Sequence, residues 1–309
     1  MAWYDEAVFY HIYPLGLLGA PKENHYDGVT HRLPELDPWI DHIREIGCNA
    51  IYIGPLFESE GHGYETTDYR KLDSRLGDNE DLKRFVENCH KAGVRVIFDG
   101  VFNHTGRNFF AFRDLKEKRE GSEYRDWYCN VNFYGNNEYN DGFSYDNWGG
   151  YNLLVKLNQR NPAVRDHICD AIRFWVKEFD IDGIRLDAAD VLDFDFMKAQ
   201  VERFRALGFP VWMDDFGTGY SSLGYLTYIP VEVVKLDKSL VDNYLVDGKD
   251  AFINDVIRLV HDLGKKMIVE GVEERQQFER LKAFGADMIQ GFYFSKPIPP
   301  SEAIRFRVR

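Results

Sequence analysis

The stretch from Ile181 to Gly219 decides the fold of this chain: it opens with IDGIRLDAADVLDFD and closes with VWMDDFGTG. At both ends of the stretch, carboxylates come directly after a short apolar run. In a parallel α/β barrel, catalytic side chains lie at the C-terminal ends of the strands. The stretch therefore predicts two strand-end sites, joined by one helix over about 194–207.

Short apolar runs followed by helix patterns occur eight times along the chain, which is typical of parallel strands with right-handed crossovers. The expected strands are 8–13, 49–53, 94–99, 181–186, 211–213, 231–236, 265–269 and 286–290. Eight such units favour an α/β fold with a single closed (β/α)8 TIM barrel. The segment after 49–53 is expected to be a loop, and a closing helix is expected from Ser301. The long segment of about 105–158 predicts a small subdomain after the third strand.

The composition limits the classes of partner. The net charge is −13, from 38 basic and 51 acidic residues, which argues against nucleic-acid and membrane-surface partners. No two of the four cysteines are spaced as in a metal knuckle, so free thiols are expected. The N-terminus lacks the pattern of a signal peptide. These features favour a cytoplasmic protein, with recombinant expression expected.

Arg185 and Asp187 are the first candidate catalytic pair. Side chains two positions apart on a strand share a face, so both are expected to point into the barrel mouth. A guanidinium at that distance favours the ionised carboxylate, as a nucleophile requires. The alternative is a structural ion pair at the barrel rim.

Four ordered motifs resemble the α-amylase glycoside hydrolase family, with neopullulanase and maltodextrin-hydrolase members most similar. They are VFYHIYPLG, HGYETTDY, DGVFNH and GIRLDAAD, and the resemblance covers about Val8 to Met197. It implies that Asp187 is the nucleophile with Arg185 beside it. It also implies that Tyr64 stacks on the sugar, and that Asp99 and His104 contact the same sugar.

From about Gln200 the chain resembles the EAL-type cyclic diguanylate phosphodiesterase domain, through DDFGTGYSSL, VVKLDKSLV, IVEGVE and ADMIQGFYFSKPIP. The resemblance implies metal ligands at Asp214 and Asp215, with Lys235 near the attacking water or phosphate. It implies that Glu270 and Glu273 support the site and that Gln290 lies in the substrate pocket. Adjacent carboxylates suit Mg²⁺ or Mn²⁺.

Neither half carries a complete site. The α-amylase family places its general acid after the fifth strand and a third Asp after the seventh, and both motifs are absent. The EAL family places a Glu, an Asn and a second Glu on strands two to four, but in this chain those strands resemble the α-amylase family. We therefore interpret residues 1–309 as an engineered chimeric barrel, with an α-amylase-like half over 1–197 and an EAL-like half over 198–309. We expect a scaffold without native catalysis and without a required cofactor.

Three alternatives stay open. The first is residual hydrolysis of α-glucans through Asp187, with Asp214, Asp215 and Glu270 at the strand positions of the missing carboxylates. The second is divalent-metal or phosphate binding at Asp214 and Asp215, in which Asp187 and Asn103 replace absent ligands. The third is a natural glycosidase with a divergent C-terminal half. A small glucan or a phosphate is the ligand expected in these cases.

Overall fold

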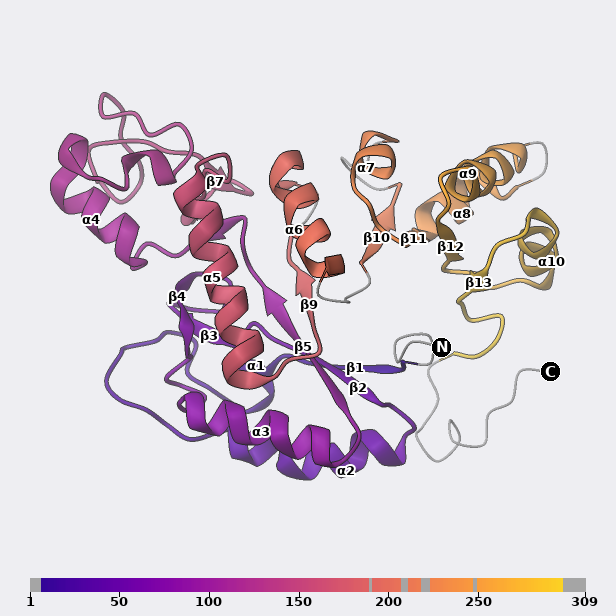
Figure 1. The fold of residues 1–309 in the computed structure, drawn as a ribbon, viewed down its shortest axis with the longest axis horizontal. Coiled ribbons are helices and arrows are strands. Elements are labelled where there is room, and N and C mark those ends of the chain that lie inside the picture. Colours follow the sequence, from indigo (N-terminus) through magenta and orange to yellow (C-terminus); the bar gives the residue numbers. More distant parts are fainter. Residues whose placement is uncertain (1–6, 189–190, 207–210, 218–222, 247–248, 297–309) are drawn as a thin grey trace. The chain divides into compact units, whose positions relative to one another are not determined.

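The computed structural model describes residues 7–188, 191–206, 211–217, 223–246 and 249–296. The chain divides into two compact units, Met1–Leu192 and Asp193–Arg309. Each unit contains one parallel sheet with helices between its strands (Figure 1). All eight expected strands are present, within a few residues of their predicted ends. The single closed barrel stays a prediction, and the helix expected from Ser301 lies outside the described residues.

The sheet of the first unit has the order β1-β2-β5-β9, and every neighbouring pair is parallel. Its strands are β1 (Phe9–Ile12), β2 (Ala50–Ile53), β5 (Arg95–Gly100) and β9 (Gly183–Leu186). The helices between them are α1 (Pro14–Leu17), α2 (Asp37–Glu45), α3 (Asn79–Lys91) and α5 (Pro162–Phe179). This order follows the sequence, so the ends of β5 and β9 lie next to each other and bring their polar residues together.

Helix α5 shows how the local sequence forms these elements. The Asn161 side chain accepts a hydrogen bond from the Ala163 N–H, and Pro162 occupies the first turn, where its missing N–H costs nothing. The buried face of the helix includes Trp175, whose ring stacks on Phe57 at 4.4 Å between centroids. The indole N–H donates to the Tyr69 carbonyl at 2.6 Å, so this large side chain is both packed and satisfied.

Two insertions extend the first unit. The segment after β2, expected to be a loop, is an antiparallel hairpin of β3 (Phe57–Ser59) and β4 (Thr66–Leu72). The segment after β5 contains α4 (Phe110–Lys118) and an antiparallel sheet of order β6-β8-β7. Its strands are β6 (His104–Thr105), β7 (Asn147–Trp148) and β8 (Tyr151–Lys156). Short 3-10 turns complete the unit at Leu33–Leu36, Arg119–Gly121 and Arg125–Trp127.

The sheet of the second unit has the order β10-β11-β12-β13, again parallel throughout. Its strands are β10 (Trp212–Phe216), β11 (Val233–Leu236), β12 (Lys266–Val269) and β13 (Met288–Ile289). The helices are α6 (Phe194–Ala206), α7 (Leu223–Tyr228), α8 (Lys238–Tyr244), α9 (Ala251–Asp262) and α10 (Arg275–Phe284). In α9, the fully buried Ile253, Ile257 and Val260 repeat at helical spacing and form its core face.

Candidate functional site

The first unit gathers five predicted residues into one cluster, which we call the sugar half-site: Tyr64, Asp99, His104, Arg185 and Asp187. Asp99 on β5 and Arg185 on β9 are register partners, so their side chains meet across the strand pair. Asp187 follows the end of β9, and its N–H donates to the Gly100 carbonyl at 3.0 Å. Parallel pairing therefore assembles the charged part of this half-site.

Arg185 joins the two carboxylates of the sugar half-site. Its Nη1 donates to Asp187 Oδ1 at 2.6 Å and to Asp99 Oδ1 at 3.1 Å. Burial acts to lower the pKa of Arg185, but the two carboxylates and Tyr52 outweigh it and raise the pKa. The guanidinium is therefore a permanent charge that holds both carboxylates in place. Its partner Asp187 has a side chain that is 17% exposed.

Asp99 is the buried member, with a side chain that is 0% exposed. Burial raises the pKa of its carboxyl group, and Arg185 opposes that rise. Its Oδ2 has no hydrogen-bond partner within the described part of the chain. A buried oxygen of this kind is costly unless a ligand or water satisfies it. Asp99 Oδ2 is thus the unsatisfied carboxylate oxygen at the buried side of the sugar half-site.

Tyr64 and His104 supply the rest of the half-site. Partial burial, together with Asp99 and Asp187, raises the pKa of Tyr64 to about 12, so its hydroxyl is a donor at neutral pH. Burial lowers the pKa of His104 to about 4, so its imidazole is neutral. His104 Nε2 is another buried atom without a partner among the described residues. These groups can stack on and hydrogen-bond a neutral polyol.

Tyr52 on β2 is a neighbour that the motifs did not reveal. Arg185 lies over its ring at 5.8 Å, and the ring stacks on His11 at 4.3 Å between centroids. Burial, followed by the charge of Asp99, raises the pKa of the Tyr52 hydroxyl. In the sequence, Tyr52 stood out only because its hydroxyl group is a polar atom within an apolar strand. The stack therefore supports Arg185 from the strand side.

The second unit gathers a separate cluster, which we call the acidic half-site: Asp214, Asp215, Lys235, Asp237 and Glu270. Lys235 on β11 contacts Glu270 Oε2 at 2.5 Å and Asp214 Oδ1 at 3.1 Å. Burial acts to lower the pKa of Lys235, but its hydrogen bonds to the two carboxylates raise it. The ammonium group is therefore charged and bridges neighbouring strands.

Asp215 and Glu270 lie close to a third carboxylate, Asp237, that was not singled out from the sequence. Oxygen atoms of these three residues all lie within 4.8 Å of one another, a spacing that a divalent cation could bridge. Burial and then Asp214 and Glu270 raise the pKa of Asp215, which records crowded negative charge. Asp237 caps α8 by accepting a hydrogen bond from the Ser239 N–H. Its position two residues after Lys235, at the end of the same apolar run, could have identified it from the sequence.

The remaining predicted residues are placed less centrally. Glu273 contacts Lys238 Nζ at 3.1 Å and so ties its loop to α8. Gln290 is exposed, and its backbone N–H donates to the Val269 carbonyl at 2.8 Å. Asn103 is buried in the first unit beside His104, with a 3.2 Å contact between Nδ2 and Nδ1. The metal site expected from Asn103, Asp187 and Asp214 takes its residues from both units and stays a prediction.

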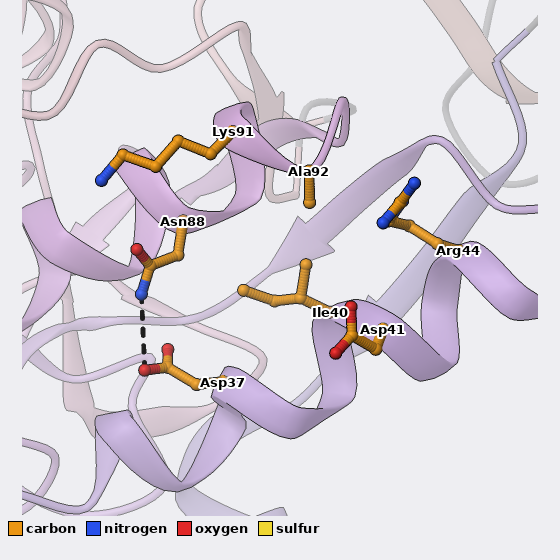
Figure 2. A pocket seen from close by; sticks show the side chains of 7 residues that line it. All are labelled: Asp37, Ile40, Asp41, Arg44, Asn88, Lys91 and Ala92. Atoms are coloured by element: carbon orange, nitrogen blue, oxygen red, sulfur yellow. Dashed lines mark hydrogen bonds between the residues drawn. The ribbon is translucent and has the colours of Figure 1, made fainter.

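A surface groove of about 380 Å³ lies between α2 and the end of α3 (Figure 2). It is lined by Asp37, Ile40, Asp41, Arg44, Asn88, Lys91 and Ala92. The Asn88 amide points to Asp37 Oδ2 at 3.4 Å, as the dashed line shows. Its two acids and two bases come from helices α2 and α3, and none of its lining residues belongs to the sugar half-site. The groove therefore adds nothing to the sites described above.

The first unit is thus an α/β structure whose parallel strand ends carry an Arg–carboxylate cluster beside a tyrosine and a histidine. A family model described as "Alpha amylase, catalytic domain" matches residues 26–207, more than half of the chain. The chain therefore belongs to the alpha-amylase family. A second family model, described as "EAL domain", matches residues 166–297.

Several curated proteins are similar in sequence to about two thirds of the chain. A maltogenic alpha-amylase of Bacillus acidopullulyticus is 35% identical over 211 residues, which are 63% of this chain and 36% of the relative. A cyclomaltodextrinase of a Bacillus species is 35% identical over 216 residues, which are 64% of this chain and 38% of the relative. The chain thus spans little more than a third of the length of these relatives.

Solved structures agree with the fold. Ttha1563 from Thermus thermophilus has a TM-score of 0.63 at 33% identity, covering 79% of this chain and 54% of that one. The debranching enzyme of Nostoc punctiforme has a TM-score of 0.65 at 26% identity, covering 87% of this chain and 64% of that one. Within the described residues, no helix is long and apolar enough to cross a membrane.

Proposed function

We propose that this chain is a chimeric barrel scaffold whose sugar half-site binds short α-glucans without hydrolysing them. The observation that carries the proposal is the Asp99–Arg185–Asp187 cluster, since it comes entirely from the first unit. Binding therefore needs nothing from the second unit. The names of the relatives, among them maltogenic amylase and cyclomaltodextrinase, support an α-glucan as the ligand class.

Hydrolysis needs more than this cluster offers. A retaining glycosidase uses a nucleophile and a general acid about 5 Å apart on either side of the glycosidic bond. Asp187 has the exposure that a nucleophile needs, but the other carboxylate of the half-site is fully buried and bound to Arg185. Asp99 therefore cannot deliver a proton to a leaving oxygen. The carboxylates after strands five and seven belong to the EAL-like half.

The two family matches support the chimeric interpretation. The alpha-amylase match ends at residue 207 and the EAL match begins at residue 166, so the two overlap over 166–207, which includes β9 and α6. Each parallel sheet has four strands, half the number of a closed (β/α)8 barrel. We propose that the two sheets are halves of one engineered barrel.

Calorimetry and a hydrolysis assay together test this proposal. Maltotriose titration should show binding by the wild-type protein and loss of binding in Tyr64→Ala. A matched control is Tyr134→Ala, because that ring is 99% exposed. A fluorogenic maltoside should be cleaved no faster by the wild type than by Asp187→Ala. Turnover above that variant would overturn the non-catalytic proposal, and absence of any maltotriose heat would overturn glucan binding.

A second candidate function is divalent-metal binding at the acidic half-site. The specific observation is the 4.8 Å grouping of oxygen atoms from Asp215, Asp237 and Glu270. Titration with manganese should give a binding heat in the wild type. Asp215→Asn and Asp237→Asn should each lower the affinity for manganese at least tenfold. Asp262→Asn, an exposed carboxylate on α9, is the control. A manganese heat unchanged in both site variants would refute this candidate.

A further inference from the structure

One face of the first sheet carries a polar row that adjoins the sugar half-site. The strand register joins His11 on β1 to Tyr52 on β2 and continues to Ile97 on β5. Asp99 follows two residues after Ile97 and pairs with Arg185 on β9. Side chains of register partners, and side chains two positions apart on a strand, share a face. All five side chains therefore lie on the face that carries the charged part of the sugar half-site.

The ring of Tyr52 connects this row to the half-site. The imidazole of His11 lies nearly parallel to the ring, at an interplanar angle of 9° and 4.3 Å between centroids. The guanidinium carbon of Arg185 lies 5.8 Å from the centre of the same ring. An aromatic ring attracts a cation over its face, and a neutral imidazole does not oppose that attraction. The ring therefore holds Arg185 in place while His11 is neutral.

His11 can take up a proton because its side chain is exposed. Burial, followed by the charge of Arg185, lowers the pKa of the imidazole below 6.5, so the neutral form predominates at pH 7. The charged or titratable groups around the stack are Arg185 from β9, Asp99 from β5 and Tyr64 from the β3–β4 hairpin. Coupling between two groups is reciprocal. Since Arg185 disfavours the protonated imidazole, a protonated imidazole disfavours Arg185 at its position on the ring of Tyr52.

We propose that the His11–Tyr52 stack is a positioning element for Arg185, and that protonation of His11 removes this support and weakens glucan binding at the sugar half-site. The inference rests on the proposed glucan binding and adds a pH dependence to it. Arg185 donates to both Asp99 and Asp187, so its displacement takes away the donor that orients the two carboxylates. His11 and Tyr52 are positioning residues, because they act through Arg185 and need no contact with the sugar.

Titration calorimetry with maltotriose at pH 7.5 and pH 5.0 tests the role of His11. The wild type should bind about fivefold more weakly at the lower pH, as expected for a modest coupling between two groups. His11→Gln cannot take up the proton and should lose less than about twofold. His25→Gln, which removes an exposed histidine, should behave as the wild type. His104, whose pKa is about 4, is present in all three proteins, so its own titration cancels in the comparison.

Two variants of Tyr52 test the role of the ring at pH 7.5. Tyr52→Phe keeps the ring and should keep the maltotriose affinity of the wild type within about twofold. Tyr52→Leu removes the ring and should weaken binding about fivefold, the value of one cation–π contact. Equal losses in the two variants would assign the effect to the hydroxyl group and overturn the inference.

A measurement without sugar separates this inference from the function on which it rests. NMR can follow the titration of His11, whose signal is the one that disappears in His11→Gln. Arg185→Met should raise the pKa of His11, because the guanidinium that opposes protonation is gone, and Arg185→Lys should raise it less. If circular dichroism shows that Arg185→Met does not fold, the calorimetric comparison of the wild type with His11→Gln decides the inference.

The outcomes are distinct. An unchanged His11 pKa in folded Arg185→Met overturns the inference and leaves glucan binding intact. Equal pH dependence of maltotriose binding in the wild type and His11→Gln does the same. If the folded wild type binds no maltotriose while Arg185→Met raises the His11 pKa, the proposed function fails and takes the pH dependence of binding with it, whereas the coupling of His11 to Arg185 is supported.

Discussion

Acidification should destabilise the first unit through His104. Burial lowers the pKa of this imidazole from 6.5 to about 4. Between these two values the unfolded chain holds a proton that the folded protein excludes, so stability rises with pH in this window. The stabilisation is complete above pH 6.5 and is lost as the pH falls toward 4.

The size of this effect follows from the pKa difference. One pKa unit corresponds to about 1.4 kcal/mol, so the full effect is about 3 kcal/mol. About 2 kcal/mol of it should be lost between pH 7 and pH 5. His104 is almost fully buried, so solvent screening reduces this figure little.

Urea denaturation at pH 7 and pH 5, followed by tryptophan fluorescence, measures the effect. Other groups titrate in the same range, so the test compares the wild type with His104→Gln, which cannot take up the proton. The variant should lose about 2 kcal/mol less on acidification than the wild type. His25→Gln removes an exposed histidine and should leave the pH dependence unchanged. Equal pH dependence in the wild type and His104→Gln would refute the reasoning.

Three further predictions concern stability. Trp175→Ala should cost about 3–5 kcal/mol in urea denaturation, because it empties a closely packed aromatic core, and Trp175→Phe should cost clearly less. Arg185→Met should lower the urea midpoint at pH 7 by leaving the buried Asp99 carboxylate without its partner, and the loss should shrink toward pH 4 as that carboxyl group takes up a proton. If the chain forms one closed barrel, calorimetric unfolding should show a single transition, and Ile257→Ala in the second unit should shift the whole of that transition. Two transitions, of which Ile257→Ala shifts only one, would contradict the barrel.

The strands could be predicted because a parallel strand that is buried on both faces has a continuous run of apolar residues. All eight runs form strands, including the short Met288–Ile289. The hairpin of β3 and β4 was missed because Thr66–Leu72 contains Asp, Arg and Lys and buries only every third residue, so it lacks both the continuous apolar run and the strict alternation of a strand. The N-terminal cap of α3 is Asp78, whose side chain accepts from the N–H groups of Glu80 and Asp81, although the next residue, Asn79, is also of a type that caps helices. Such differences depend on local geometry that several polar neighbours could supply.

The sites were predictable where spacing within one strand fixes the geometry. Arg185 and Asp187 are two residues apart, and their contact follows from strand periodicity. The hydrogen bond from Arg185 to Asp99 joins residues 86 positions apart and depends on the register of β5 and β9. That register cannot be derived from a single sequence. The ring contact between His104 and Trp148 likewise depends on the pairing of β6, β8 and β7.

The charges of the two half-sites explain why they should respond differently to cations. In the sugar half-site, one guanidinium bonds both of the carboxylates that it faces, so little charge is left uncompensated. In the acidic half-site, four carboxylates face one ammonium, and the raised pKa of Asp215 records the imbalance. A divalent cation would offset that excess, whereas a neutral glucan would not. Manganese should therefore raise the unfolding midpoint through the second unit, and that rise should disappear in Asp215→Asn but persist in Asp187→Ala.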